Sequence, residues 1–179
     1  MSRQWTLVAI IVAGLAAGAW ALTRFAPETD RVAVGAPAPD FRAIDLATGD
    51  SVSLREHYRG SVTLVNIWAT WCEPCKIEMP AMEALYRSLA PRGFKIAAVS
   101  IDEGPPEDVQ AFRQKLGLSF DILQDRSTRI QQRYQTTGVP ESFLLDRNGV
   151  VLKRVIGAHD WNSAANRALV ERLLNDTGR

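Results

Sequence analysis

The chain has 179 residues, of which 46% are apolar and 23% are charged, and its formal net charge is +1. This length suits one domain of ordinary size with a short additional segment. The near-neutral balance excludes the basic excess expected of a nucleic-acid-binding protein, and no acidic run indicates a disordered tail.

The first apolar segment, Trp5–Leu22, contains no charged residue and lies between Arg3 and Arg24. It is nearly as long as the ~20 residues that cross ~30 Å of hydrocarbon as a helix. A cleaved signal peptide is the alternative, because Ala17-Gly18-Ala19 offers small residues for cleavage, although the apolar core of a signal peptide is usually only about 7–15 residues long. In both cases we expect the rest of the chain to be exported, with its soluble part on the extracytoplasmic (periplasmic) side of the cell membrane.

The chain therefore divides into a membrane anchor or uncleaved signal at residues 1–25, a linker at 26–33 and a soluble domain at 34–179. Apolar periodicity and turn residues predict the elements of this domain. They are strands at Phe41–Leu46 and Ser51–Leu54 forming a small hairpin, a helical turn at Leu54–Tyr58, a buried strand at Ser61–Ile67, a helix at Lys76–Leu89, a strand at Phe94–Ile101, a helix from Pro105 and Pro106 to Leu116, a strand at Phe120–Leu123, a helix at Ser127–Tyr134 capped by Ser127, a hairpin of Phe143–Leu145 and Val150–Ile156, and a helix at Asn162–Asn175. This alternation predicts an α/β sheet with helices on both faces.

Both cysteines lie in Cys72-Glu73-Pro74-Cys75, where a buried strand turns into a helix. A free thiol has a pKa of about 8.5, and a helix N-terminus brings that of a C-x-x-C thiol towards about 7 or lower. Cys72, the outer residue, is the predicted nucleophile. Cys75, one turn deeper, is predicted to resolve the mixed disulfide.

Other uses of the pair fit less well. As a structural staple, a ring of about four residues stabilises by only roughly 2 kcal/mol. Zinc needs four ligands, and His57 and His159 lack metal-motif spacing to the cysteines. Covalent haem attachment requires His directly after the second cysteine, where Lys76 stands. We therefore expect no metal and no cofactor, and an exported chain with one close pair is expected to act on the disulfides of other proteins.

Glu78 lies three residues after Cys75, on the same stripe as Met82, Leu85 and Leu89. A carboxyl buried beneath the cysteines would have a raised pKa and would exchange protons during thiol exchange. The alternative, equally compatible with the spacing, is a solvent-facing glutamate at the start of the stripe.

Four motifs together resemble the membrane-tethered TlpA/ResA/CcmG-type thiol–disulfide oxidoreductases, over about residues 35–161. They are Gly35-x-x-Ala38-Pro39-Asp40-Phe41, Asn66-x-Trp68-Ala69-Thr70-Trp71-Cys72-x-Pro74-Cys75, Glu78 with Pro80, and Gly138-Val139-Pro140-x-x-Phe143-Leu144-Leu145-Asp146. The resemblance implies a thioredoxin-like fold, in which a central mixed sheet is flanked by helices and carries an N-terminal β-hairpin extension and a central insertion at about 101–134.

The resemblance also implies site residues. Val139–Pro140 is expected to be a cis peptide facing Cys72, whereas only about 5–6% of X-Pro bonds are cis. Substrate contacts are expected at Trp71, Val139, Pro140 and Glu141. Glu141 resembles the residue of the cytochrome-maturation branch, or it is an exposed strand residue.

The implied activity is reduction of disulfides in exported proteins, recharged by a membrane electron donor of the thiol–disulfide type, often in cytochrome c maturation. Glu73 between the cysteines opposes thiolate formation and so favours a reductase over a disulfide oxidase of the same fold. A thiol peroxidase is less compatible, because these enzymes place Thr three residues before the nucleophile, where Ala69 stands. A different class stays open, a copper-binding carrier, since two thiolates suffice for two-coordinate Cu(I).

Overall fold

The computed structural model of the chain describes residues 2–25 and 32–176. The chain divides into two compact units, Met1–Asp30 and Arg31–Arg179. Most of the expected linker, residues 26–31, lies outside the described residues. Val32 from that linker is only 4% exposed and belongs to the hydrophobic core of the second unit.

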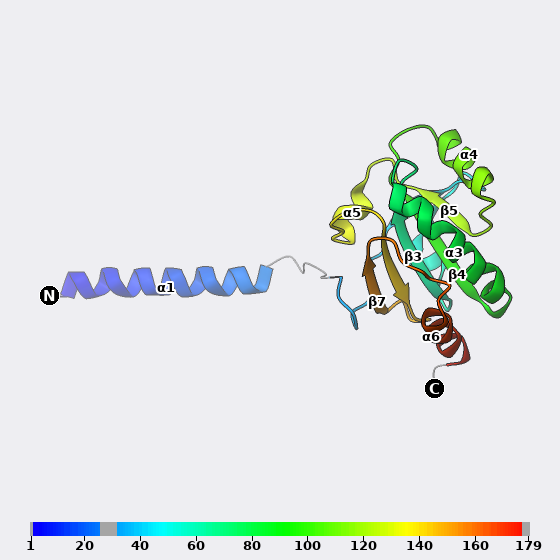
Figure 1. The fold of residues 1–179 in the computed structure, drawn as a ribbon. Coiled ribbons are helices and arrows are strands. Elements are labelled where there is room, and N and C mark those ends of the chain that lie inside the picture. Colours follow the sequence, from blue (N-terminus) through cyan, green and yellow to red (C-terminus); the bar gives the residue numbers. More distant parts are fainter. Residues whose placement is uncertain (1, 26–31, 177–179) are drawn as a thin grey trace. The chain divides into compact units, whose positions relative to one another are not determined.

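Figure 1 shows the helices and strands in chain order. They are α1 (Ser2–Phe25), β1 (Arg42–Asp45), β2 (Ser51–Ser53), α2 (Leu54–His57), β3 (Val62–Trp68), α3 (Glu73–Leu89), a short 3₁₀ helix η1 (Ala90–Arg92), β4 (Phe94–Ser100), α4 (Pro106–Leu116), β5 (Asp121–Gln124), α5 (Arg129–Arg133), β6 (Glu141–Leu145), β7 (Val151–Ile156) and α6 (Ala164–Asn175).

Helix α1 makes up most of the first unit. Its segment Gln4–Ala21 is long and apolar enough to cross a membrane, and a cleaved signal sequence near an N-terminus has the same properties. Its described side chains from Gln4 to Trp20 are exposed.

The second unit is built on a seven-stranded mixed sheet in the order β2-β1-β5-β4-β3-β6-β7. β3 pairs with β4 in parallel, β4 pairs with β5 in parallel, and the other pairs are antiparallel. The predicted N-terminal hairpin is confirmed: β1 and β2 pair and join the sheet through β5. Because the elements between β4 and β6 include β5, the central insertion supplies the strand that attaches this hairpin.

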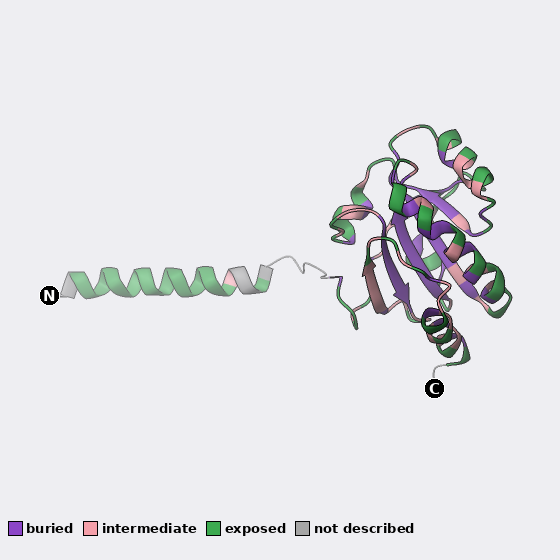
Figure 2. Ribbon diagram, viewed as in Figure 1, coloured by how far each residue is buried: buried purple, intermediate pink, exposed green. Residues whose placement is uncertain are grey.

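Strand β3 lies inside the sheet and is buried along its whole length, which explains its continuous apolar composition (Figure 2). Side chains of Leu64 and Asn66 point to one face and those of Thr63 and Val65 to the other. Helices α3 and α6 cover the Asn66 face and are joined where Arg167 donates to the Ser88 hydroxyl at 2.7 Å.

One helix start differs from the sequence prediction. Helix α5 begins after Thr128, a residue at φ 57°, and Ser127 does not cap it. The Ser127 hydroxyl instead donates to Asp125 at 2.5 Å, and the other oxygen of Asp125 accepts the Ile130 N–H at 2.9 Å. A carboxylate five residues upstream therefore satisfies the helix N–H, which a local capping pattern does not reveal.

Candidate active site

The two cysteines form a disulfide at the point where β3 gives way to α3, with their Cα atoms 5.3 Å apart. Cys72 is the N-cap of α3, and its Sγ accepts the N–H of Cys75 at 3.2 Å. Cys72 is 5% exposed, whereas Cys75 is fully buried. Once the disulfide is reduced, this N–H and the positive end of the helix dipole favour the thiolate at Cys72, the more accessible sulfur.

A buried carboxylate holds the turn that leads into Cys72. Asp102, 7% exposed, accepts the N–H of Thr70 at 3.0 Å and its hydroxyl at 2.6 Å. The Ser100 hydroxyl also donates to Asp102, at 2.6 Å. The end of β4 therefore anchors the backbone two residues before the outer cysteine, a contact that the sequence analysis missed.

Glu78 is 2% exposed, and its expected neighbours on the stripe, Met82, Leu85 and Leu89, are also buried. The prediction of a buried acid is confirmed, and the solvent-facing alternative is wrong. Burial raises the pKa of Glu78 from 4.5 to about 7, against the lowering effect of two hydrogen bonds from Asn66 and the His159 backbone. A carboxyl with this pKa exists in both protonation states near neutral pH, as a proton carrier requires.

The partners of Glu78 come from three separate segments. The Asn66 amide donates to Glu78 Oε1 at 2.7 Å and to the Ser142 hydroxyl at 2.9 Å, and the His159 N–H donates to Glu78 Oε2 at 3.2 Å. Sequence reasoning missed Ser142 and gave His159 no part in the site, although His159 is half-buried and its backbone N–H donates to Glu78. The available signal was Asn66 itself, a polar side chain inside an apolar strand.

The Val139–Pro140 peptide is cis, as expected, whereas its position facing Cys72 stays a prediction. Glu141, the next residue, opposes Ile67 in the β3–β6 pairing, so the start of β6 lies beside the strand end that carries the cysteine turn. Trp71, next to Cys72, is 64% exposed and Val139 is half-buried. These two side chains present apolar surface to solvent near the disulfide.

Glu141 is fully buried and forms an ion pair with Arg154, with Nε and Oε1 2.5 Å apart. Its other oxygen accepts the Thr137 N–H at 3.0 Å. The alternative of an exposed strand residue is therefore wrong, because β6 is covered on both faces. The Glu141 carboxylate therefore holds the loop before Pro140 by a hydrogen bond from the protein interior.

The family model of the AhpC/TSA family matches residues 34–154, which is most of the second unit. The chain belongs to the AhpC/TSA family. Curated proteins similar to this chain include the thiol-disulfide oxidoreductases ResA of Geobacillus kaustophilus, 39% identical over 161 residues, and of Geobacillus thermodenitrificans, 38% identical over 165 residues. Each comparison covers 88% of this chain and 91% of the relative.

Solved structures agree with the fold of this AhpC/TSA member. The thioredoxin domain of a thiol-disulfide oxidoreductase from Bacteroides vulgatus is 27% identical with a TM-score of 0.69, over 80% of this chain and 99% of that one. A thiol:disulfide interchange protein from Bacteroides sp. is 26% identical with a TM-score of 0.69, over 83% and 94%. The chain is thus a thioredoxin-like thiol–disulfide oxidoreductase, and both the predicted fold and the predicted class of enzyme are confirmed.

Proposed function

We propose that this enzyme reduces disulfides in exported proteins on the extracytoplasmic side of the membrane, with Cys72 as nucleophile. The observation that carries the proposal is the hydrogen bond from the Cys75 N–H to Cys72 Sγ, with Cys75 buried behind it. This arrangement supports Cys72 as the nucleophilic cysteine and Cys75 as the resolving cysteine. The same asymmetry does not arise from a structural staple, which needs neither an accessible sulfur nor a stabilised thiolate.

The reaction runs in two exchanges. In the reduced enzyme the Cys72 thiolate attacks one sulfur of the client disulfide, which forms a mixed disulfide and expels the other client sulfur as a thiolate. Cys75 then attacks Cys72 Sγ, which releases the second client sulfur and leaves the enzyme disulfide seen here. The client gains two electrons and two protons, and a membrane dithiol donor restores the enzyme by the reverse exchange.

Glu78 is the proposed proton carrier for the second exchange. Cys75 is buried, so water does not readily take its proton, and Glu78 lies one helical turn further along α3. As a carboxylate Glu78 accepts that proton, and in its neutral form it returns one to a departing thiolate. Its pKa of about 7 suits transfer in both directions.

The direction of the reaction rests on the resemblance to reductases rather than on Glu73. The expected effect of Glu73 on the thiolate is offset, because Lys76 forms an ion pair with it at the surface. The N-terminal helix is long and apolar enough for a single-pass anchor, and the proposed location of the catalytic unit outside the cytoplasm rests on the resemblance. Among exported clients, apocytochrome c is the proposed one, on the same resemblance.

Two single substitutions test the proposal. Cys72→Ala is expected to abolish insulin reduction. Cys75→Ala is expected to accumulate mixed disulfides, which are seen on non-reducing gels and disappear after treatment with dithiothreitol. Trapping in the native host then identifies the client and the donor, and a captured apocytochrome c supports the cytochrome role. Equal turnover by both variants and the wild type contradicts the mechanism.

Tight one-to-one Cu(I) binding by the reduced protein, with negligible reductase activity, supports the copper carrier in place of the reductase. Cu(I) binding and reductase activity are measured on the same reduced preparation, so the copper-carrier and reductase hypotheses are compared directly.

A further inference from the structure

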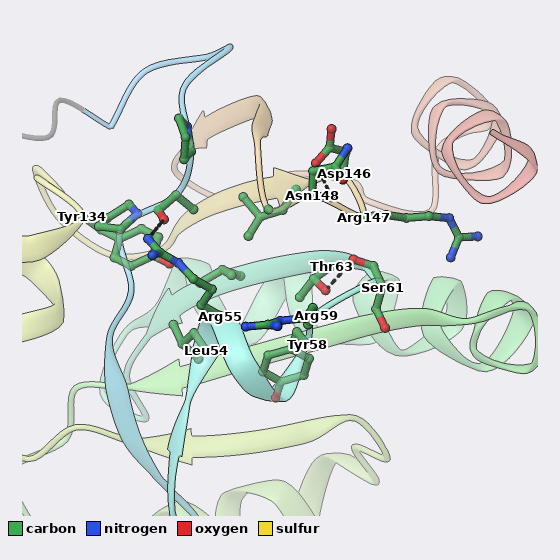
Figure 3. A pocket seen from close by; sticks show the side chains of 16 residues that line it. Leu54, Arg55, Tyr58, Arg59, Ser61, Thr63, Tyr134, Asp146, Arg147 and Asn148 are labelled. Carbon is green, nitrogen blue, oxygen red and sulfur yellow. Dashed lines mark hydrogen bonds between the residues drawn. The ribbon is translucent and has the colours of Figure 1, made fainter. Parts of the chain in front are cut away.

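A cavity of about 310 Å³ lies on the face of the sheet opposite α3 (Figure 3). Thr63 and Val65 of β3 line it, and their side chains alternate with that of Asn66, which contacts Glu78. Neither cysteine, nor Glu78, nor Pro140 lines the cavity. It is therefore a site separate from the disulfide.

The walls of the cavity are mostly apolar. They come from the segment before β1, from α2 and from the end of β6, and include Pro37, Ala38, Pro39, Leu54, Tyr58 and Leu145. A cavity of this size and lining is at the small end of the range for ligand sites, which combine apolar walls with a few polar groups. The walls suit a compact apolar body.

Tyr134 supplies a polar group that no protein atom satisfies. Its side chain is fully buried, it lines the cavity, and its hydroxyl has no hydrogen-bond partner among residues 2–25 and 32–176. Burial raises the pKa of Tyr134, so the hydroxyl stays a neutral donor. Because the residue and its hydroxyl have essentially no accessible surface, Tyr134 forms part of the closed wall, and its hydroxyl does not reach an occupant of the cavity.

Two arginines of the lining add positive charge to the cavity. Figure 3 shows Arg55 extending towards Tyr134 and Arg59 lying beside Tyr58, whereas Arg147 points away. The guanidinium of Arg55 donates only to the Ala38 carbonyl, at 3.3 Å, and the side chain of Arg59 makes no hydrogen bond or ion pair within the described part of the chain. Both therefore remain available to an anion.

One acidic side chain, that of Asp146, belongs to the lining. Asp146 Oδ1 is occupied by the N–H groups of Asn148 at 2.8 Å and Val150 at 2.9 Å, within the turn between β6 and β7. The guanidinium of Arg147 donates to the carbonyls of Gly60 and Leu174, each at 3.0 Å, so these contacts within the protein already occupy it. The positive charge of Arg55 and Arg59 is therefore only partly offset, by Asp146 in the lining and by Asp40, which interacts electrostatically with Arg55.

We propose that this cavity binds a small organic carboxylate. Its apolar body packs on the walls, and its carboxylate accepts hydrogen bonds from the guanidinium groups of Arg59 and Arg55. Guanidinium groups bind carboxylates with paired, charge-assisted hydrogen bonds, which makes an acid preferable to a neutral molecule of the same shape. A diacyl phospholipid exceeds the volume, so the ligand is a free small molecule.

The test uses the full chain in phosphatidylcholine nanodiscs and titrates it calorimetrically with 3-phenylpropanoate and with its neutral analogue, 3-phenylpropanamide. The wild type is expected to bind the acid about tenfold more tightly than the amide. Arg59→Gln is expected to weaken acid binding about tenfold and to leave amide binding unchanged. Tyr134→Phe keeps the ring and removes a hydroxyl that the ligand does not reach, so it is expected to leave acid binding unchanged.

Arg129→Gln is the matched control, because Arg129 is exposed and does not line the cavity. Insulin reduction by every variant verifies the fold independently of ligand binding. Absence of binding, equal affinity for acid and amide, or an Arg59→Gln variant that binds the acid like the wild type overturns the proposal. These outcomes leave the disulfide reductase proposal untouched, since none of these residues belongs to its site.

Discussion

At the scale of single residues, the site places two ionisable groups in opposite environments. Cys72 receives an N–H at the positive end of a helix, which favours its charged form. Glu78 lies in an apolar surrounding that disfavours its charged form. With a pKa of about 7, the Glu78 carboxyl takes up and releases a proton near neutral pH without a large free-energy step, as the proposed exchange with Cys75 requires.

The raised pKa of Glu78 makes a prediction about stability. Because this pKa is about 7 in the folded protein and near 4.5 in the unfolded chain, the folded state holds the proton more strongly between these values. The contribution of Glu78 is therefore fully present below pH 4.5 and is lost as the pH rises through 7. Relative to Glu78→Gln, the oxidised wild type is expected to lose roughly 3 kcal/mol of unfolding free energy over this window.

Urea denaturation of the oxidised proteins at pH 4.5 and at pH 8 measures this difference. Glu107→Gln on exposed α4 controls for the general effect of removing a carboxylate. A wild-type-minus-Gln difference that does not change with pH contradicts the burial argument.

At the scale of elements, β3 carries one polar side chain that sets the state of an acid on α3. Asn66→Leu removes the N–H donor that stabilises the Glu78 carboxylate, so the pKa of Glu78 is expected to rise further above its ordinary range. The pH midpoint of the stability difference described above then moves to higher pH. Ser142→Ala, which loses a contact to Asn66 but none to Glu78, is expected to move it less.

Strands β6 and β7 are joined by a buried ion pair whose loss is costly. Arg154→Met leaves the fully buried Glu141 carboxylate without its cation, which is expected to reduce the unfolding free energy by about 3–5 kcal/mol. Arg42→Met is the control: its ion pair with Glu56 spans 3.9 Å between exposed side chains, and such pairs contribute about 1 kcal/mol or less.

Denaturant titration of both variants compares the two pairs directly. Adding Glu141→Gln to Arg154→Met is expected to recover part of the loss, because the uncompensated charge is removed. Equal effects of Arg154→Met and Arg42→Met would show that Glu141 is not effectively buried.

At the scale of the whole molecule, an apolar helix precedes a redox unit with a single disulfide. If Gln4–Ala21 anchors the chain, the mature protein is expected to keep its N-terminus and to stay in membranes after a carbonate wash. Intact mass spectrometry of that fraction measures both properties. A shorter, soluble mature protein indicates a cleaved signal instead, and export of the redox unit is expected in either case.

The chain by itself determined the order of elements and the centre of the chemistry. Apolar runs such as β3, the periodic stripe of α3 and turns such as Asn148-Gly149 are local patterns, because pleat, helical pitch and turn conformation depend on neighbouring residues. The same locality placed Cys72 and Cys75 at a helix N-terminus and Glu78 on the apolar stripe, but it left open whether Glu78 is buried, which the structure decided. The motifs then identified the cis proline, which no periodicity indicates.

Only the tertiary structure decided which distant groups meet. His159 reaches Glu78 from 81 residues away, Asp102 holds Thr70 from 32 residues away, and Arg154 neutralises Glu141 from the neighbouring strand. The cavity under α2 likewise joins segments from residue 37 to residue 149. Such contacts depend on the order and register of strands in the sheet, which arise from packing over the whole domain and leave no fixed spacing in the sequence.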